Sequence, residues 1–128
     1  MITDEIRTHL LTETDISDLV GNRIFAIALP QEVDFPAVTF ILASNNRVNT
    51  MDGVVASSHS RIRFHVYTET YEECKVLSQA IRKKMDLLPS EVGIVSSNSF
   101  LGMNDGDLET DLDLRHRVLE FMVYFNEN

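Results

Sequence analysis

A strand-like segment followed at once by a helix-capping motif constrains the fold more than any other part of the chain. Apolar and polar residues alternate along Arg61–Tyr67. This two-residue period predicts a half-buried strand, with Ile62, Phe64 and Val66 facing the core. Thr70-Tyr71-Glu72-Glu73 then matches the S/T-x-x-E capping box that opens many helices. The segment therefore predicts a strand leading directly into a helix.

The predicted helix has one apolar stripe with three- and four-residue spacing, as an amphipathic helix requires. The stripe consists of Tyr71, Cys74, Leu77, Ala80, Ile81, Met85 and Leu88. Arg82, Lys83 and Lys84 fall in the last turns, where the helix dipole favours cations. Pro89 is expected to end the helix. Cys74 is expected to be a small buried hydrophobic residue, and one cysteine excludes an internal disulfide.

The other predicted elements complete an α+β domain. Helices are expected at residues 4–11, capped by Thr3, and at Asp15–Val20, ended by Gly21. Strands are expected at Arg23–Ala28, at Ala37–Ala43 in the centre of the sheet, at Val92–Leu101 and at Leu112–Phe125, and Pro30–Pro36 is expected to be a connector. These elements predict a single domain over residues 1–128, with a mostly antiparallel sheet, one long helix packed across it and short N-terminal helices.

Two features of the predicted strands need a local explanation. Residues 44–60 are polar and contain Asp52-Gly53, which favours a turn, so we expect a protruding hairpin loop or arm there. In the last strand the apolar positions change from even numbers, at Leu112 and Leu114, to odd numbers from Leu119 onward. A one-residue bulge around His116 would account for this change.

Composition limits the class of partner. The 128 residues carry a formal charge of −9, from 20 acidic and 11 basic residues, which disfavours tight and direct DNA binding. No window approaches the roughly 18 apolar residues that a membrane span needs. The acidic N-terminus lacks the pattern of a signal peptide, so we expect the chain to be made and folded in the cytosol.

No catalytic, cofactor or metal site is predicted. The four histidines show no i, i+4 pair and have no cysteine cluster nearby, and His65 and His116 are expected on polar strand faces, solvated or at an interface. The acidic run after Asn104 fails as an EF-hand loop, because aligning Gly106 to the glycine position puts apolar residues at ligand positions. A solvated turn is the expected structure there. Phosphate-binding loops and nucleophile elbows are absent from the sequence.

Several short motifs follow one another along residues 10–88. They run Ile16-Ser17-Asp18-Leu19-Val20-Gly21-Asn22-Arg23-Ile24, then Ala28-Leu29-Pro30-Gln31, then Phe35-Pro36-Ala37-Val38-Thr39-Phe40, then Asp52-Gly53, and finally the stretch from Arg61 to Cys74. This ordered set resembles the tail completion, or tail-to-head joining, proteins of long-tailed bacteriophages and prophages. Family members often have alanine at the place of Cys74, and the stretch after Pro89 carries no diagnostic motif.

The resemblance implies a structural virion protein without enzymatic activity. Such a protein would form a hexameric ring at the head-proximal end of the tail tube, contacting the tube protein and the head connector or stopper while DNA passes without specific binding. The expected subunit-interface arm comprises Asn45, Asn46, Arg47, Asn49, Asp52, Gly53, Ser57 and His59. The acids expected to face the channel or the connector are Asp105, Asp107, Glu109, Asp111 and Asp113. The implied location is the head–tail junction of the virion, after assembly in the host cytoplasm.

Two alternatives remain open at the level of sequence. One is another neck or tube component, either a head-side stopper or a tail tube subunit that would polymerise into long tubes. The other is a cytosolic α+β module, such as a small dimeric ligand-binding domain or an unrecognised enzyme, which would need a defined pocket.

Overall fold

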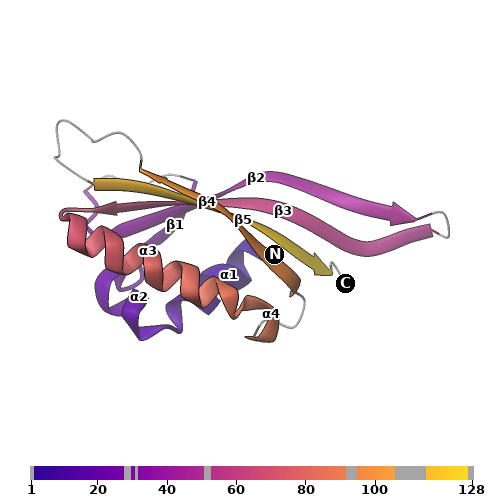
Figure 1. Ribbon diagram of the computed structural model, residues 1–128, viewed down its shortest axis with the longest axis horizontal. Coiled ribbons are helices and arrows are strands. Elements are labelled where there is room, and N and C mark those ends of the chain that lie inside the picture. The colour runs from indigo at the N-terminus through magenta and orange to yellow at the C-terminus, as the bar shows by residue number, and fades with distance from the viewer. Residues whose placement is uncertain are drawn as a thin grey trace.

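The chain folds into a five-stranded sheet with its helices gathered on one face, as the computed structural model shows (Figure 1). The structure describes residues 2–27, 30, 32–50, 53–91, 95–105 and 115–126. Its elements are α1 (Ile2–Leu11), α2 (Thr14–Val20), β1 (Ile24–Ala26), β2 (Ala37–Thr50), β3 (Gly53–Thr68), α3 (Tyr71–Asp86), α4 (Leu88–Glu91), β4 (Val95–Asp105) and β5 (Arg115–Asn126). The predicted α+β class, with one long helix across a mostly antiparallel sheet, is confirmed.

The sheet has the order β1-β2-β3-β5-β4, so β3 is the middle strand. Only β1 and β2 are parallel, and the other three pairs are antiparallel. β2, expected at the centre, has neighbours on both sides only along Val38–Phe40, where it pairs with both β1 and β3. Beyond Phe40, no described strand pairs with the outer edge of β2.

The core lies between the sheet and α3. The buried side chains of α3 include Cys74, Leu77, Ile81 and Met85, and Leu88 of α4 is also buried, as the apolar stripe predicts. They face the buried residues of β3 and β5, among which Phe64 and Phe121 pack edge to face with ring centroids 5.7 Å apart. This apolar layer removes the largest side chains from water, which is the main stabilising contribution to a domain of this size.

The ends of the helices differ in part from the predictions. Thr70 caps α3 as expected, since its Oγ1 accepts a hydrogen bond from the Glu73 amide at 3.2 Å. Tyr71, expected in the core, is 57% exposed, with the Arg117 guanidinium 5.8 Å from its ring. Pro89 does not end a helix but lies in the first turn of α4, where its missing N–H leaves no helical hydrogen bond unmade.

The short N-terminal helices are present with one change of boundary. α1 begins at Ile2, so Thr3 lies inside the helix and is not its cap. Gly21 ends α2 as predicted, and its amide donates to the Ser17 carbonyl at 2.8 Å. Its φ of 63° and ψ of −111° are angles that suit glycine, because a side chain would strain this backbone.

The predicted bulge at His116 is wrong. β5 pairs with β3 from Arg115 to Asn126 without a register shift, and Leu119, Phe121, Val123 and Phe125 are buried on one face. Leu112 and Leu114 lie outside the described residues. The irregular strand is β4, whose register against β5 shifts between Val95 and Ser97 and again between Phe100 and Gly102. The bulges are thus on an edge strand, where they disturb no second neighbour.

Candidate assembly surfaces

The predicted polar arm is a continuation of two strands and not a loop. Residues 44–50 of β2 pair with β3 from Ser44↔Arg61 to Thr50↔Gly53, with a register shift between Val48 and Asn49. A ladder of this kind is made by backbone groups, so polar side chains do not prevent it. β5 flanks β3 as far as Ser57, and of the described residues only 49–50 and 53–56 extend past β5, as a hairpin tip (Figure 1).

The residues expected in the arm therefore fall into two groups. Asn45, Asn46, Arg47 and Asn49 lie on β2 with Ser60, His59, Ser58 and Val54 as their register partners, while Gly53 begins β3 and Asp52 lies outside the described residues. Ser57 and His59 lie in the sheet between β2 and β5. The His59 ring packs against Tyr124 of β5, with centroids 5.5 Å apart. The projecting part is thus shorter than predicted.

Asp105, the described member of the predicted acidic set, lies toward the other end of the sheet. Asp105 is the last residue of β4, and its register partner is Arg117, which in turn pairs with Val66 of β3. The hairpin tip continues from the opposite end of β3, beyond the Ser57↔Asn126 pair. Asp107, Glu109, Asp111 and Asp113 lie outside the described residues. Asp105 and the hairpin tip are therefore not brought together, and a role for the acids stays a prediction.

The face of the sheet away from the helices carries a row of polar and aromatic side chains. We call this the open face and define it by the side chains of Arg61, Arg63, His65, Tyr67, His116, Val118, Glu120, Met122 and Tyr124, which alternate with the buried residues of β3 and β5. None of the described helices covers it (Figure 1). Sequence reasoning placed His65 and His116 on a polar strand face, and this is confirmed.

Two pairs organise the middle of the open face. Arg63 Nε donates to Glu120 Oε1 at 2.8 Å. His65 Nδ1 and His116 Nε2 are 2.8 Å apart, and the His116 ring stacks on Tyr67 with centroids 4.6 Å apart and an interplanar angle of 8°. Burial, then the neighbouring His116 and Arg63, lowers the pKa of His65 below its ordinary value of 6.5, and Glu120 partly opposes this. His65 is therefore mostly neutral at pH 7.

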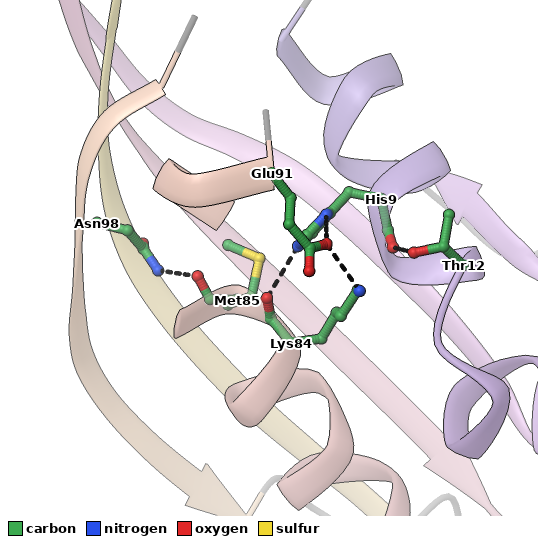
Figure 2. A network of polar contacts seen from close by, with 6 residues as sticks. All are labelled: His9, Thr12, Lys84, Met85, Glu91 and Asn98. Carbon is green, nitrogen blue, oxygen red and sulfur yellow. Dashed lines mark hydrogen bonds and ion pairs between the residues drawn. The ribbon is translucent and has the colours of Figure 1, made fainter. Parts of the chain in front are cut away.

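A second polar cluster lies on the helical side and was missed from the sequence. Figure 2 shows His9 of α1 held between α3 and α4, with its Nε2 2.8 Å from the Lys84 carbonyl oxygen. Since a carbonyl can only accept, Nε2 carries the hydrogen. Glu91 Oε2 accepts from Lys84 Nζ at 2.8 Å and lies 3.2 Å from His9 Nδ1. We call these three residues the polar junction.

The polar junction fixes the N-terminal helices to the end of α3. His9 and Lys84 are only 5% and 7% exposed, so their polar groups must find partners inside the protein. The hydrogen bond from Lys84, together with the charges of Lys84 and His9, lowers the pKa of Glu91, against a smaller opposing effect of desolvation. Nearby, Asn98 of β4 donates to the Met85 carbonyl at 2.7 Å, which joins the edge strand to the same helix end (Figure 2).

Sequence reasoning treated Lys84 only as a cation near a helix C-terminus and His9 only as a residue without metal-binding partners. A lone histidine on the apolar side of a short helix gives no signal of a partner 75 residues away. The one available hint was that Lys84 directly precedes Met85, a residue of the apolar stripe. Lys84 lies three residues after Ile81 of the same stripe, and this i, i+3 spacing places the two side chains on neighbouring positions of one helix face.

The described residues offer packing surfaces and little chemistry. Within them, no group of three or more His, Cys, Asp or Glu side chains is placed to hold a metal ion. Cys74 is buried at 2% exposure, as predicted. A search of the described helices finds none that is both long enough and apolar enough to cross a membrane.

Comparison with known proteins gives a matching family and similar solved structures, among them a virion chain and a bacteriophage protein. The family model described as tail completion protein gp17 matches residues 4–126. A chain in the virion of a native gene transfer agent particle has a TM-score of 0.69 at 15% identity, over 94% of this chain and 91% of that chain. The structure of bacteriophage SPP1 gp17 protein has a TM-score of 0.58 at 16% identity, over 98% and 88%. No curated protein sequence matches the chain. At these identities the two solved structures show a shared fold.

Proposed function

The chain belongs to the tail completion protein gp17 family, and from this membership we propose that it is a structural subunit of a phage particle that closes the head-proximal end of the tail tube and joins it to the head connector. It acts there as a hexameric ring around the DNA channel and has no catalytic role. The observation that carries the proposal is the family match over nearly the whole chain, from residue 4 to residue 126. The likeness of its fold to a chain of a virion particle supports it.

The β2–β3 hairpin is the element that we assign to contacts between subunits. Residues 41–50 of β2 form an outer edge that no described strand covers, and the tip, described at residues 49–50 and 53–56, extends past β5. A two-stranded hairpin is only marginally stable by itself, and an open strand edge readily pairs with another chain. In the ring, the hairpin lies across the neighbouring subunit and adds backbone hydrogen bonds there.

The acidic segment from Asp105 to Asp113 is assigned to the channel or to the connector surface. A basic lumen would hold DNA phosphates and release their counterions, whereas an acidic one lets DNA pass without binding it. The location of Asp105 at the opposite end of β3 from the hairpin tip separates this role from that of the hairpin. The partners proposed for the ring are the tail tube protein and the head connector or stopper protein.

Electron microscopy of particles made without this chain tests the proposal directly. If the gene is disrupted in the parent phage or prophage, negative-stain images should show DNA-filled heads beside detached tails of irregular length. Restoring the gene should restore joined particles. Normal infectious particles in the disrupted strain would overturn the proposal, and long tubes formed by the purified chain alone would instead indicate a tube subunit.

Charge reversal separates the channel role from a general effect of charge. Asp107→Lys, Glu109→Lys and Asp111→Lys, combined in one chain, should slow DNA ejection or block joining, because the channel or connector surface would become basic. The matched control reverses three exposed acids elsewhere, Glu32, Glu69 and Asp86. Equal behaviour of both variants would contradict the role assigned to the acidic segment.

A further inference from the structure

The open face of the sheet is more apolar along β5 than a solvated face requires. Val118, Met122 and Tyr124 occupy three of its positions on β5, and Tyr124 is 39% exposed. The opposite face of the same strand is buried with Leu119, Phe121 and Val123. A strand that is apolar on both faces is typical of a sheet covered on both sides. Within the described residues, the helices cover only one side.

At the edge strand β4, beside β5, there is unfilled space on the same side of the sheet as the open face. Gly102 of β4 has Glu120 as its register partner, and a Cβ added to Gly102 would meet no atom within 4 Å. Gly102 has no positive φ, so this position does not need glycine for its backbone conformation. A larger side chain could therefore be accommodated by the protomer. The space beside Gly102 is therefore available to a side chain of another protein chain that packs on this face.

The charge of the open face differs from that of the whole chain. Its described residues include Arg61 and Arg63 but only one acid, Glu120, although the chain as a whole carries −9. Helices α1 and α2, with Glu13 as the N-cap of α2, lie on the other side of the sheet and carry five acids and one arginine. The acids are Asp4, Glu5, Glu13, Asp15 and Asp18. The arginine, Arg7, donates to backbone carbonyls of Ile24 and Asn22 within the protomer.

We propose that the open face of one copy packs against the acidic surface of α1 and α2 of a second copy. Packing two open faces on each other would bring arginines toward arginines, whereas the acidic helices offer the opposite charge. Because the two surfaces lie on opposite sides of the protomer, the contact is head-to-tail, and such contacts close into rings when the rotation allows it. This inference rests on the proposed ring and specifies which surfaces form it.

A zero-length cross-link tests the contact in assembled particles. All lysines of the chain, Lys75, Lys83 and Lys84, belong to α3, so Arg61→Lys places a single new amine on the open face. A carbodiimide should join position 61 to an acid of α1 or α2, and mass spectrometry should identify the peptide pair. The sheet separates these surfaces within one protomer, so the link must join two copies. The unmodified chain, treated identically, is the control.

A wedge in the open space gives an independent measurement. Gly102→Phe should leave the melting temperature unchanged or raise it, since a strand interior favours a larger residue over glycine. Incorporation into particles should fall by about tenfold or more, the effect of losing roughly 1.4 kcal/mol at a contact. Val76→Phe, a similar enlargement at an exposed position of α3, serves as the matched control and should leave incorporation unchanged.

The outcomes separate this inference from the proposed function. Links from position 61 to α1 or α2, together with loss of incorporation for Gly102→Phe, support the head-to-tail contact. Links between two copies of position 61, links to another protein, or normal incorporation of Gly102→Phe would overturn it while the ring proposal stands. Absence of the unmodified chain from the head–tail junction would instead overturn the proposed function.

Discussion

The two faces of the sheet are built from the same strands but serve different ends. Along β3, Ile62, Phe64 and Val66 are fully buried under the helices, while Arg63 and His65, which alternate with them, lie on the open face. The covered face is completed within one chain, by apolar packing that needs no partner. The open face holds a mixture of apolar, aromatic and charged groups that the protomer leaves half-exposed. The proposed contact on the open face therefore predicts that substitutions at adjacent positions of β3 will change stability and assembly separately.

The energetics of the two faces differ as strongly as their composition. A fully buried large side chain contributes several kcal/mol, because its loss removes burial and leaves a cavity. The Arg63–Glu120 pair has side chains 35% and 27% exposed, and water and salt weaken such a pair to about 0–1 kcal/mol. The covered face thus determines whether the chain folds, and the open face is available for contacts between chains.

The largest expected effect comes from the centre of the covered face. Phe64→Ala should lower the free energy of unfolding by about 3–5 kcal/mol, because Phe64 is fully buried against the rings of Phe40 and Phe121. Its neighbour on the open face, Arg63→Ala, should change it by about 1 kcal/mol or less. Urea unfolding followed by circular dichroism measures both. Equal losses would mean that the two faces do not differ in the way described.

Substitutions in the polar junction should lower stability less than Phe64→Ala does, and the two partners of the ion pair should differ in their effect. Glu91→Ala leaves the buried ammonium of Lys84 without its carboxylate, whereas Lys84→Met leaves Glu91, whose side chain is 41% exposed and can be hydrated. Glu91→Ala should therefore lower the melting temperature more than Lys84→Met does. Differential scanning calorimetry at neutral pH compares the two variants, and the reverse order would contradict this account of the junction.

The junction also predicts part of the acid sensitivity. The pKa of Glu91 is lowered from 4.5 in the folded chain, so its contribution is present above that pH and is lost as the pH falls through the folded-state pKa. Glu91→Gln should flatten this part of the stability profile. Unfolding curves of both chains across the acidic pH range measure this. If Glu91→Gln and the unmodified chain showed the same dependence of stability on pH, the hydrogen bond from Lys84 would not contribute as described.

Apolar residues of the open face should affect assembly more than stability. Met122→Gln should change the free energy of unfolding by about 1 kcal/mol or less, since its side chain is only partly buried. Incorporation into particles should nevertheless fall, because a polar group would be buried at the contact between copies. Quantitative immunoblotting of purified particles measures incorporation, with Val76→Gln on exposed α3 as the control. If Met122→Gln entered particles as often as the unmodified chain does, the open face would have no separate role in assembly.

The smallest expected effect is a shift in pH dependence at the histidine pair. Because the pKa of His65 is lowered below 6.5 on folding, the unfolded chain takes up a proton first as the pH falls. The free energy of unfolding therefore decreases from about pH 6.5 downward, through the folded-state pKa. His65→Gln should reduce this decrease. NMR titration of the His65 ring gives the pKa, and a value at or above 6.5 would contradict the prediction.

Local sequence signals predicted the covered face well. The capping box at Thr70, the stripe around Leu77 and the alternation along Arg61–Tyr67 each describe a physical requirement within one element. These elements bury apolar groups against one another, and burial imposes a period that can be read from sequence. The α+β class follows from the same signals.

Contacts between distant segments were not predictable in this way. Residues 44–60 were expected to form a protruding hairpin loop or arm, because their polar residues carry no burial period, and the backbone ladder along residues 44–50 and 53–60 was not predicted. The link from His9 to Lys84 and Glu91 joins elements far apart in the chain, and no spacing rule relates them. The apparent change of period before Leu119 suggested a bulge at His116, but β5 pairs with β3 without a register shift from Arg115 onward.

The position of β5 between β3 and β4 has a consequence for the order of folding during synthesis. β4 is made before β5, yet its described sheet neighbour is β5 alone. On the ribosome, a chain that has emerged only as far as β4 holds a strand with no described sheet neighbour, and both the core under Phe121 and the surface around Met122 are still missing. A chain interrupted there lacks the β5 half of the open face, so it cannot offer the complete open face to a second copy in the head-to-tail contact proposed above.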